Sequence, residues 1–63
     1  MDEKIQTILD SFHNGQKKQM VKQIKDYGQA RFFLDFYESM DYYVIDNFSA
    51  LYTRIVYTFF LLK

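Results

Sequence analysis

Residues 41–62, DYYVIDNFSALYTRIVYTFFLL, carry the pattern that decides the fold. Apolar residues recur every three or four positions along this stretch: Ile45, Phe48, Leu51, Tyr52, Ile55, Phe59 and Leu62. This spacing predicts a long amphipathic helix. The β-branched and aromatic residues of YYVI and TRIVYTFF are a competing strand signal. A strand reading would place apolar residues on both faces without any turn signal, so the helix is favoured.

Two earlier stretches show the same periodicity. A helix over Asp2–Phe12 would align four apolar residues on one side: Ile5, Ile8, Leu9 and Phe12. A helix over Gln16–Tyr27 would align Met20, Val21, Ile24 and Tyr27. Gly15 and Gly28 follow these stretches, and glycine is the commonest residue just past the end of a helix. The sequence therefore predicts two short helices that stop at glycines.

A third helix is predicted over Gln29–Met40, which is apolar around most of its circumference. One stripe holds Ala30, Phe33, Leu34 and Tyr37, and an adjoining stripe holds Phe32, Phe36 and Met40. A helix of this kind is expected to be largely buried. Ser39 and Asp41 suit a helix cap, but no glycine marks a break there. The sequence leaves open whether the third and fourth helices are separate.

Together these patterns predict one all-α domain, residues 1–63, built as a small bundle of three to four helices with a long C-terminal helix. A domain of 63 residues buries only about 60% of its unfolded surface and is marginal as a monomer. The chain has no cysteine and one histidine, His13. Disulfides and the usual zinc sites are therefore excluded, and neither a metal nor a cofactor is predicted. Heavy apolar packing, self-association or both are expected instead.

The sequence offers little for catalysis. Its Ser and Thr residues lie in no nucleophile elbow, and two glycines cannot form a phosphate loop. His13 lies beside an Asn-Gly turn, where an exposed imidazole without a chemical role is expected. We therefore predict a protein that is not an enzyme. The N-terminal residues MDEKIQTILD lack the apolar core of a secretory signal, which together with the absence of cysteine predicts a cytoplasmic location.

Four lysines in the second helix raise the alternative of nucleic-acid binding: Lys17, Lys18, Lys22 and Lys25. The last three fall within about 60° of one another on a helix, so they are candidate phosphate contacts. However, the net charge of the chain is zero, whereas DNA-binding domains need a net basic surface. The helix after Gly28 is also too apolar to lie in a DNA groove. A solvated lysine face is the favoured reading.

The last helix carries more apolar residues than one side can hold. Thirteen of the 63 residues are Phe or Tyr, more rings than one small core is expected to enclose. Five large residues lie off the core-facing arc and are the predicted partner-binding residues: Tyr42, Tyr43, Tyr57, Phe60 and Leu61. Exposed apolar patches usually mark interfaces, and tyrosine is favoured in them. We therefore predict a protein–protein interaction factor that self-associates, with a homodimer as the first expectation, or binds a foreign protein.

Membrane insertion is not expected. The most apolar run, SALYTRIVYTFFLL, is 14 residues long, which is shorter than the ~20 residues a spanning helix needs. Extending the run back to Tyr42 gives a stretch that includes Asp46 and Asn47 as well as Arg54, which already lies within the run. Charged groups in mid-membrane cost at least about 2.5–3.5 kcal/mol each.

The run FHNGQKKQM, from Phe12 to Met20, is followed by Gln23-Ile24 and Tyr27-Gly28. It resembles a pattern, F-x-N-G-Q-[KR]-[KR]-Q, found in small uncharacterised proteins of bacteriophages and prophages. The resemblance covers about a quarter of the chain and does not extend clearly into residues 41–63. It implies an accessory phage protein that acts in the host cytoplasm by binding a host protein and blocking or redirecting it. It supplies no catalytic residue.

Overall fold

The computed structural model describes the backbone of residues 3–39 and 45–63, with side chains for 3–39 and 50–63. The described residues form four α-helices: α1 (Glu3–His13), α2 (Lys17–Tyr27), α3 (Gln29–Ser39) and α4 (Ile45–Leu62). The predicted all-α bundle with a long C-terminal helix is confirmed. The third and fourth helices are separate elements, which the sequence had left open. Residues 41–44, the predicted start of the last helix, lie outside the described part.

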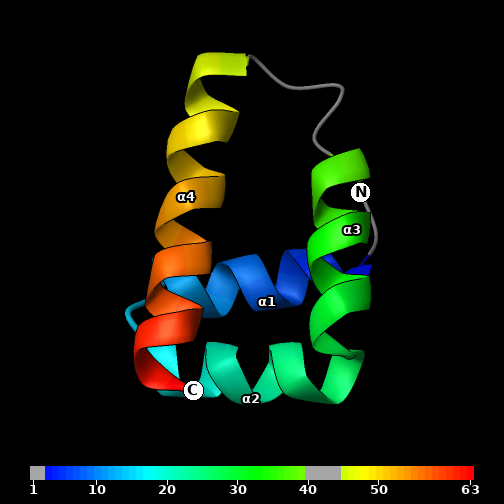
Figure 1. Ribbon diagram of the computed structural model, residues 1–63. Coiled ribbons are helices and arrows are strands. Elements are labelled where there is room, and N and C mark those ends of the chain that lie inside the picture. Colours follow the sequence, from blue (N-terminus) through cyan, green and yellow to red (C-terminus); the bar gives the residue numbers. More distant parts are fainter. Residues whose placement is uncertain (1–2, 40–44) are drawn as a thin grey trace.

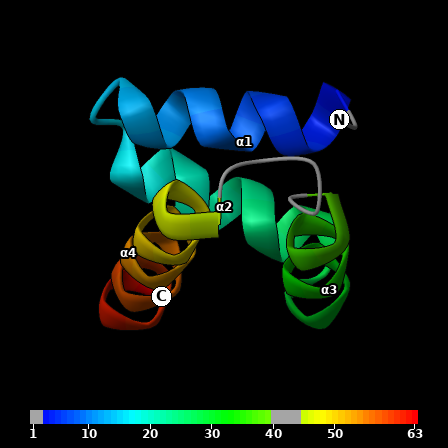
Figure 2. The same ribbon diagram turned by 90° about the horizontal axis from the view of Figure 1, so that it is seen from above.

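The four helices are arranged in two layers (Figure 1). α1 and α2 form one layer, and α3 and α4 stand side by side on it, running in opposite directions. In the view from above, α3 and α4 are seen nearly along their axes, and both lie on the same side of α1 (Figure 2). α2 contacts each of the other three helices. It is therefore the central support of the bundle.

The turn between α1 and α2 is set by Gly15. Its φ of +80° lies in the left-handed region, which glycine adopts without strain. The Gly15 N–H donates to the Phe12 carbonyl at 3.1 Å, and the Gln16 N–H donates to the Ser11 carbonyl at 2.9 Å. These two bonds are those of a Schellman motif. The predicted helix stop at Gly15 is confirmed, with α1 extending one residue further than expected, to His13.

The core is made where the apolar sides of all four helices meet. Among the residues whose side chains are described, eleven buried hydrophobic residues form it: Ile5, Ile8, Leu9, Phe12, Met20, Val21, Ile24, Phe32, Phe36, Ile55 and Phe59. Each belongs to an apolar stripe predicted from the spacing. Tyr27, Phe33, Leu51 and Tyr52 pack against this cluster while staying partly exposed. The core positions predicted from the periodicity are confirmed for most of α1 and α2 and, in α4, for Ile55 and Phe59.

The prediction that the third helix is largely buried is wrong. Phe32 and Phe36 are fully buried, but Leu34 and Tyr37 are each more than half exposed. Because α2 packs under the start of α3 and α4 lies along one side of it, the outward side of α3 has no covering element among the described residues. Leu62, expected in the core, is 40% exposed in the last turn of α4.

A polar link fixes the angle between α2 and α3. The Tyr27 hydroxyl donates a hydrogen bond of 2.6 Å to Oδ2 of Asp35. Arg31 Nε donates to the same oxygen at 3.1 Å. The Tyr27 ring also meets the edge of Phe32, with centroids 5.8 Å apart. One carboxylate thus ties the end of α2 to the middle of α3 across the short connection at Gly28.

Core truncation should be far more costly than truncation on the outward side of α3. Leu9→Ala removes buried methyl groups and is expected to lower the free energy of unfolding by about 2–5 kcal/mol, most of the stability of a domain this small. Leu34→Ala, the matched control in another helix, should change it by no more than about 0.5 kcal/mol. Urea denaturation of dilute protein, followed by circular dichroism at 222 nm, makes the comparison. Equal losses for the two variants would contradict the described burial.

The Tyr27 hydroxyl should contribute measurably to stability. Tyr27→Phe keeps the ring packing but removes the bond to the Asp35 carboxylate, so we expect a loss of about 1–2 kcal/mol in the free energy of unfolding. Tyr57→Phe removes an exposed hydroxyl and serves as the control, with no change expected. The same urea titration reports both variants, and identical midpoints would argue against the link.

Candidate functional site

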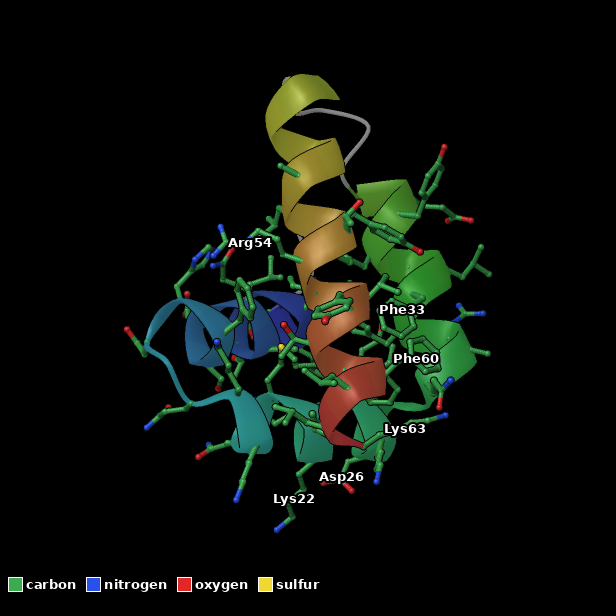
Figure 3. The ribbon with its side chains drawn as sticks, turned by 60° about the vertical axis from the view of Figure 1, so that its left-hand side comes forward. Lys22, Asp26, Phe33, Arg54, Phe60 and Lys63 are labelled. Atoms are coloured by element: carbon green, nitrogen blue, oxygen red, sulfur yellow. The ribbon has the colours of Figure 1, made fainter. Side chains whose placement is uncertain are left out.

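α3 and α4 are joined by stacked and edge-on rings, which we call the aromatic seam: Phe33, Phe36, Tyr37, Tyr52, Phe59 and Phe60. Phe33 lies within 6.1 Å, between ring centroids, of Tyr52, Phe59 and Phe60. Tyr52 in turn stacks on Phe36 at 5.3 Å and meets the edge of Tyr37 at 5.9 Å. Figure 3 shows Phe33 and Phe60 close together between the two helices. The seam therefore runs along both helices.

The aromatic seam has a buried side and an open side. Phe36 and Phe59 are completely buried against the α1–α2 layer. Phe60, the next residue along α4, is 47% exposed, and Tyr37 is 57% exposed. Lys63 reaches over the Phe60 ring, with its Nζ 4.6 Å from the ring centroid. The rings thus hold the bundle together on one side and face solvent on the other.

We call the open side the α3–α4 face. It consists of Ala30, Phe33, Leu34 and Tyr37 from α3 with Tyr52, Thr53, Val56, Tyr57, Phe60 and Leu61 from α4. The α4 residues line an open hollow of about 600 Å³. Among the described large hydrophobic side chains, Tyr57 and Leu61 are the most exposed, at 67% and 66%. The face is almost entirely aromatic and aliphatic.

The α3–α4 face is large for a chain of this size. At these exposed fractions, Tyr37, Tyr57 and Phe60 alone leave roughly 250–430 Å² of ring surface in water. The largest apolar patch on an ordinary monomer is about 300–600 Å² in total and is often functional. Leu34 and Leu61 add to the ring surface. The face therefore exceeds the scattered apolar exposure that needs no explanation.

The structure places three of the predicted partner-binding residues, Tyr57, Phe60 and Leu61, together on this face. The other two, Tyr42 and Tyr43, lie outside the described residues. Leu34 and Tyr37 were missed, because their stripe on α3 was assigned to the core. A signal was present: Arg31 and Glu38, on the same side of the helix as Leu34, indicate a stripe open to water.

The four lysines are all exposed but do not form one surface. Lys18 and Lys22 lie along the outer side of α2 beside Asp26, and Lys22 and Asp26 point away from the bundle (Figure 3). Lys17 instead lines a second hollow of about 330 Å³ with Phe12, Arg54 and the end of α4, which shares Tyr57 and Leu61 with the hollow on the α3–α4 face. The Arg54 guanidinium lies 5.4 Å from the Phe12 ring centroid, where it packs α4 against α1.

Within the described residues, no helix has the length and apolar content needed to cross a membrane. No group of three or more His, Asp or Glu side chains in those ranges is placed to hold a metal ion. Comparison of the chain with family models, with curated proteins and with solved structures finds no match. The α3–α4 face is the candidate site because it gathers exposed apolar side chains.

Proposed function

We propose that this chain is a small non-enzymatic protein–protein interaction factor that docks through the α3–α4 face. The observation that carries the proposal is the set of large apolar side chains that both helices leave exposed, with those of α4 lining an open hollow. Buried aromatic anchors dominate the binding energy of protein interfaces. Tyrosine packs over a large area at a low cost in conformational entropy and keeps a hydroxyl at its tip.

The composition of the face supports docking rather than catalysis. Its polar groups are the hydroxyls of Tyr37, Tyr52, Thr53 and Tyr57, set among rings and aliphatic chains. A catalytic site needs a nucleophile or an acid–base pair held in geometry with an orienting group. The face supplies shape and apolar area instead, which are the properties that an interface uses.

The proposal extends to a phage accessory role in the cytoplasm of a host cell, where the partner would be a host protein whose activity is blocked or redirected. Its support is the motif resemblance of residues 12–20. Those residues form the α1–α2 turn, whose hydrogen bonds are structural. The motif therefore supports a relationship in fold to the small phage proteins, while the α3–α4 face would bind the partner.

Site-specific photo-crosslinking tests the docking role. A benzophenone amino acid replaces Tyr57, at the centre of the exposed α4 surface, in the full chain expressed in its native host or in a bacterial cell. The same amino acid replaces Lys22, an exposed position on α2, as the matched control. We expect protein adducts after illumination from position 57 and far fewer from position 22, because only the former lies on the docking face.

The mass of the adduct identifies the class of partner. An adduct of twice the 7.7 kDa chain mass is a self-complex, and any other discrete mass is a foreign protein. Both results support docking through the face. Absence of adducts at position 57, or equal adducts at both positions, would contradict the proposal.

A nucleic-acid-binding regulator is the second candidate. It is favoured by one observation, the exposed row of Lys18, Lys22 and Lys25 on α2. The adjacent Asp26 carboxylate and the zero net charge work against phosphate binding.

Fluorescence anisotropy with a labelled DNA duplex at physiological salt separates the two candidates. Docking through the α3–α4 face predicts no saturable binding below about 10⁻⁴ M, the weak end of non-specific DNA affinity. Tighter binding that weakens steeply with added salt, and that Lys18→Glu with Lys22→Glu abolishes, would favour the regulator instead.

A further inference from the structure

We infer that the occupant of the α3–α4 face is a second copy of this chain, docked with its α3 antiparallel to the first about a two-fold axis. This inference rests on the proposed docking function and names its partner. It is carried by three features: the charge pattern of α3, the exposed apolar surface of α4 at the same level, and the size of that surface.

The outward side of α3 carries an apolar centre with opposite charges at its two ends. Arg31, Leu34 and Glu38 follow at spacings of three and four, so they share one side of the helix. The Arg31 side chain is 70% exposed, Leu34 is 53% exposed, and Glu38 is also exposed. The two charges are seven positions apart, a rise of about 10 Å.

Arg31, Leu34 and Glu38 form what we call the α3 strip. Its charges match those of a second α3 strip only when the two helices are antiparallel. An antiparallel copy brings Arg31 against Glu38 of the second copy, and Glu38 against Arg31 of the second copy, with the two Leu34 side chains meeting at the axis. A parallel copy would place like charges together. The bond from Arg31 Nε to Asp35 uses one of the five guanidinium N–H donors, so Arg31 keeps donors for a carboxylate across the interface.

The same axis makes α4 complementary to itself. Phe33 of α3 contacts Phe59 and Phe60 of α4, and Phe36 contacts Tyr52. Leu34 lies between Phe33 and Phe36 in α3, so it stands beside the middle of residues 52–60 of α4. The two-fold operation therefore reverses α4 about a point near Val56. It brings the exposed apolar surface around Tyr57, which lines the hollow on α4, against the same surface of the second copy. One patch that meets its own copy is what an isologous interface requires.

The area also suits a second copy of this size. The chain measures 27 × 19 × 18 Å along its principal axes, so a two-helix face covers most of one side. A standard stable interface buries about 800 Å² per partner. Tyr37, Tyr57 and Phe60 alone supply roughly 250–430 Å² of apolar area, to which Leu34, Leu61 and the charged residues at the rim add. In an antiparallel pair of copies, each Arg31 faces a Glu38. Binding to a foreign partner would not require this self-matching arrangement of charges, so the arrangement favours self-docking.

Charge swaps combined with mixing test the inference by sedimentation equilibrium. Wild-type protein should sediment at twice 7.7 kDa when concentrated and dissociate on dilution. Arg31→Glu leaves only acids on the strip, and Glu38→Arg leaves only bases. Each variant alone should raise the dimer Kd about tenfold or more. An equimolar mixture should regain the dimer, because each acidic strip then faces a basic one, and the double swap should regain it within one chain.

The controls separate docking from folding. Lys18→Glu, a charge reversal on the outer side of α2, should leave the Kd unchanged. Circular dichroism checks that each variant keeps its helices, since the carboxylate introduced by Arg31→Glu would lie one turn from Asp35. If Arg31→Glu loses helicity, the double variant Arg31→Gln with Glu38→Gln replaces it and should raise the Kd without any recovery on mixing. An unchanged Kd in that variant would overturn the inference.

Failure of self-docking is distinguishable from failure of docking altogether. A wild-type monomer at all concentrations, or single swaps as dimeric as wild type, would overturn the antiparallel dimer. So would the absence of recovery when the folded single variants are mixed. If position 57 then still crosslinks to a foreign protein, the docking function stands and its partner is not a second copy. If position 57 yields no adduct, the docking function fails as well.

Discussion

The stacking of α3 rings on α4 rings is the contact on which the rest of the structure depends. The two helices meet through side chains of the aromatic seam rather than by close approach of their backbones. Each such ring pair contributes about 0.5–1.5 kcal/mol beyond its buried area. The α1–α2 layer covers one side of the seam, where Phe36 and Phe59 are fully buried. The other side has no layer of its own chain among the described residues, so the seam that builds the bundle also creates its apolar face.

This arrangement links stability to association. A domain of 63 residues has a small core and a correspondingly small free energy of unfolding. Binding to the folded state adds stability in proportion to the logarithm of partner concentration. A second copy on the α3–α4 face would remove Tyr57, Phe60 and Leu61 from water and would supply the layer that the chain lacks. These side chains, which are exposed to water in the monomer, would then be part of a core shared by the two chains.

Most of the fold follows from apolar spacing, and the limits of that prediction are physical. The 3.6-residue period identified the buried sides of α1, α2 and α4, and Gly15 ended α1 through its positive φ. Periodicity reports which residues share a side of a helix but not which neighbour covers that side. That is why the stripe of Leu34 and Tyr37 was assigned to the core while Phe32 and Phe36 occupy it. Contacts between helices, such as Tyr27 with Asp35 or Arg54 with Phe12, depend on the crossing angles and carry no pattern in the sequence. Of the candidate site, the α4 half was predictable because α4 has more apolar residues than one side can hold.

The central claim is that neighbouring rings of α4 divide between the core and the open face. Nuclear magnetic resonance of dilute protein with a soluble nitroxide relaxation agent measures this directly, residue by residue. The ring protons of Tyr57 and the methyl groups of Leu61 should relax strongly as the agent is added, while the Phe59 ring and the Ile55 methyl groups should stay protected. Equal protection of Tyr57 and Phe59 in the dilute monomer would contradict the account, because the chain would then shelter by itself the surface assigned here to a partner.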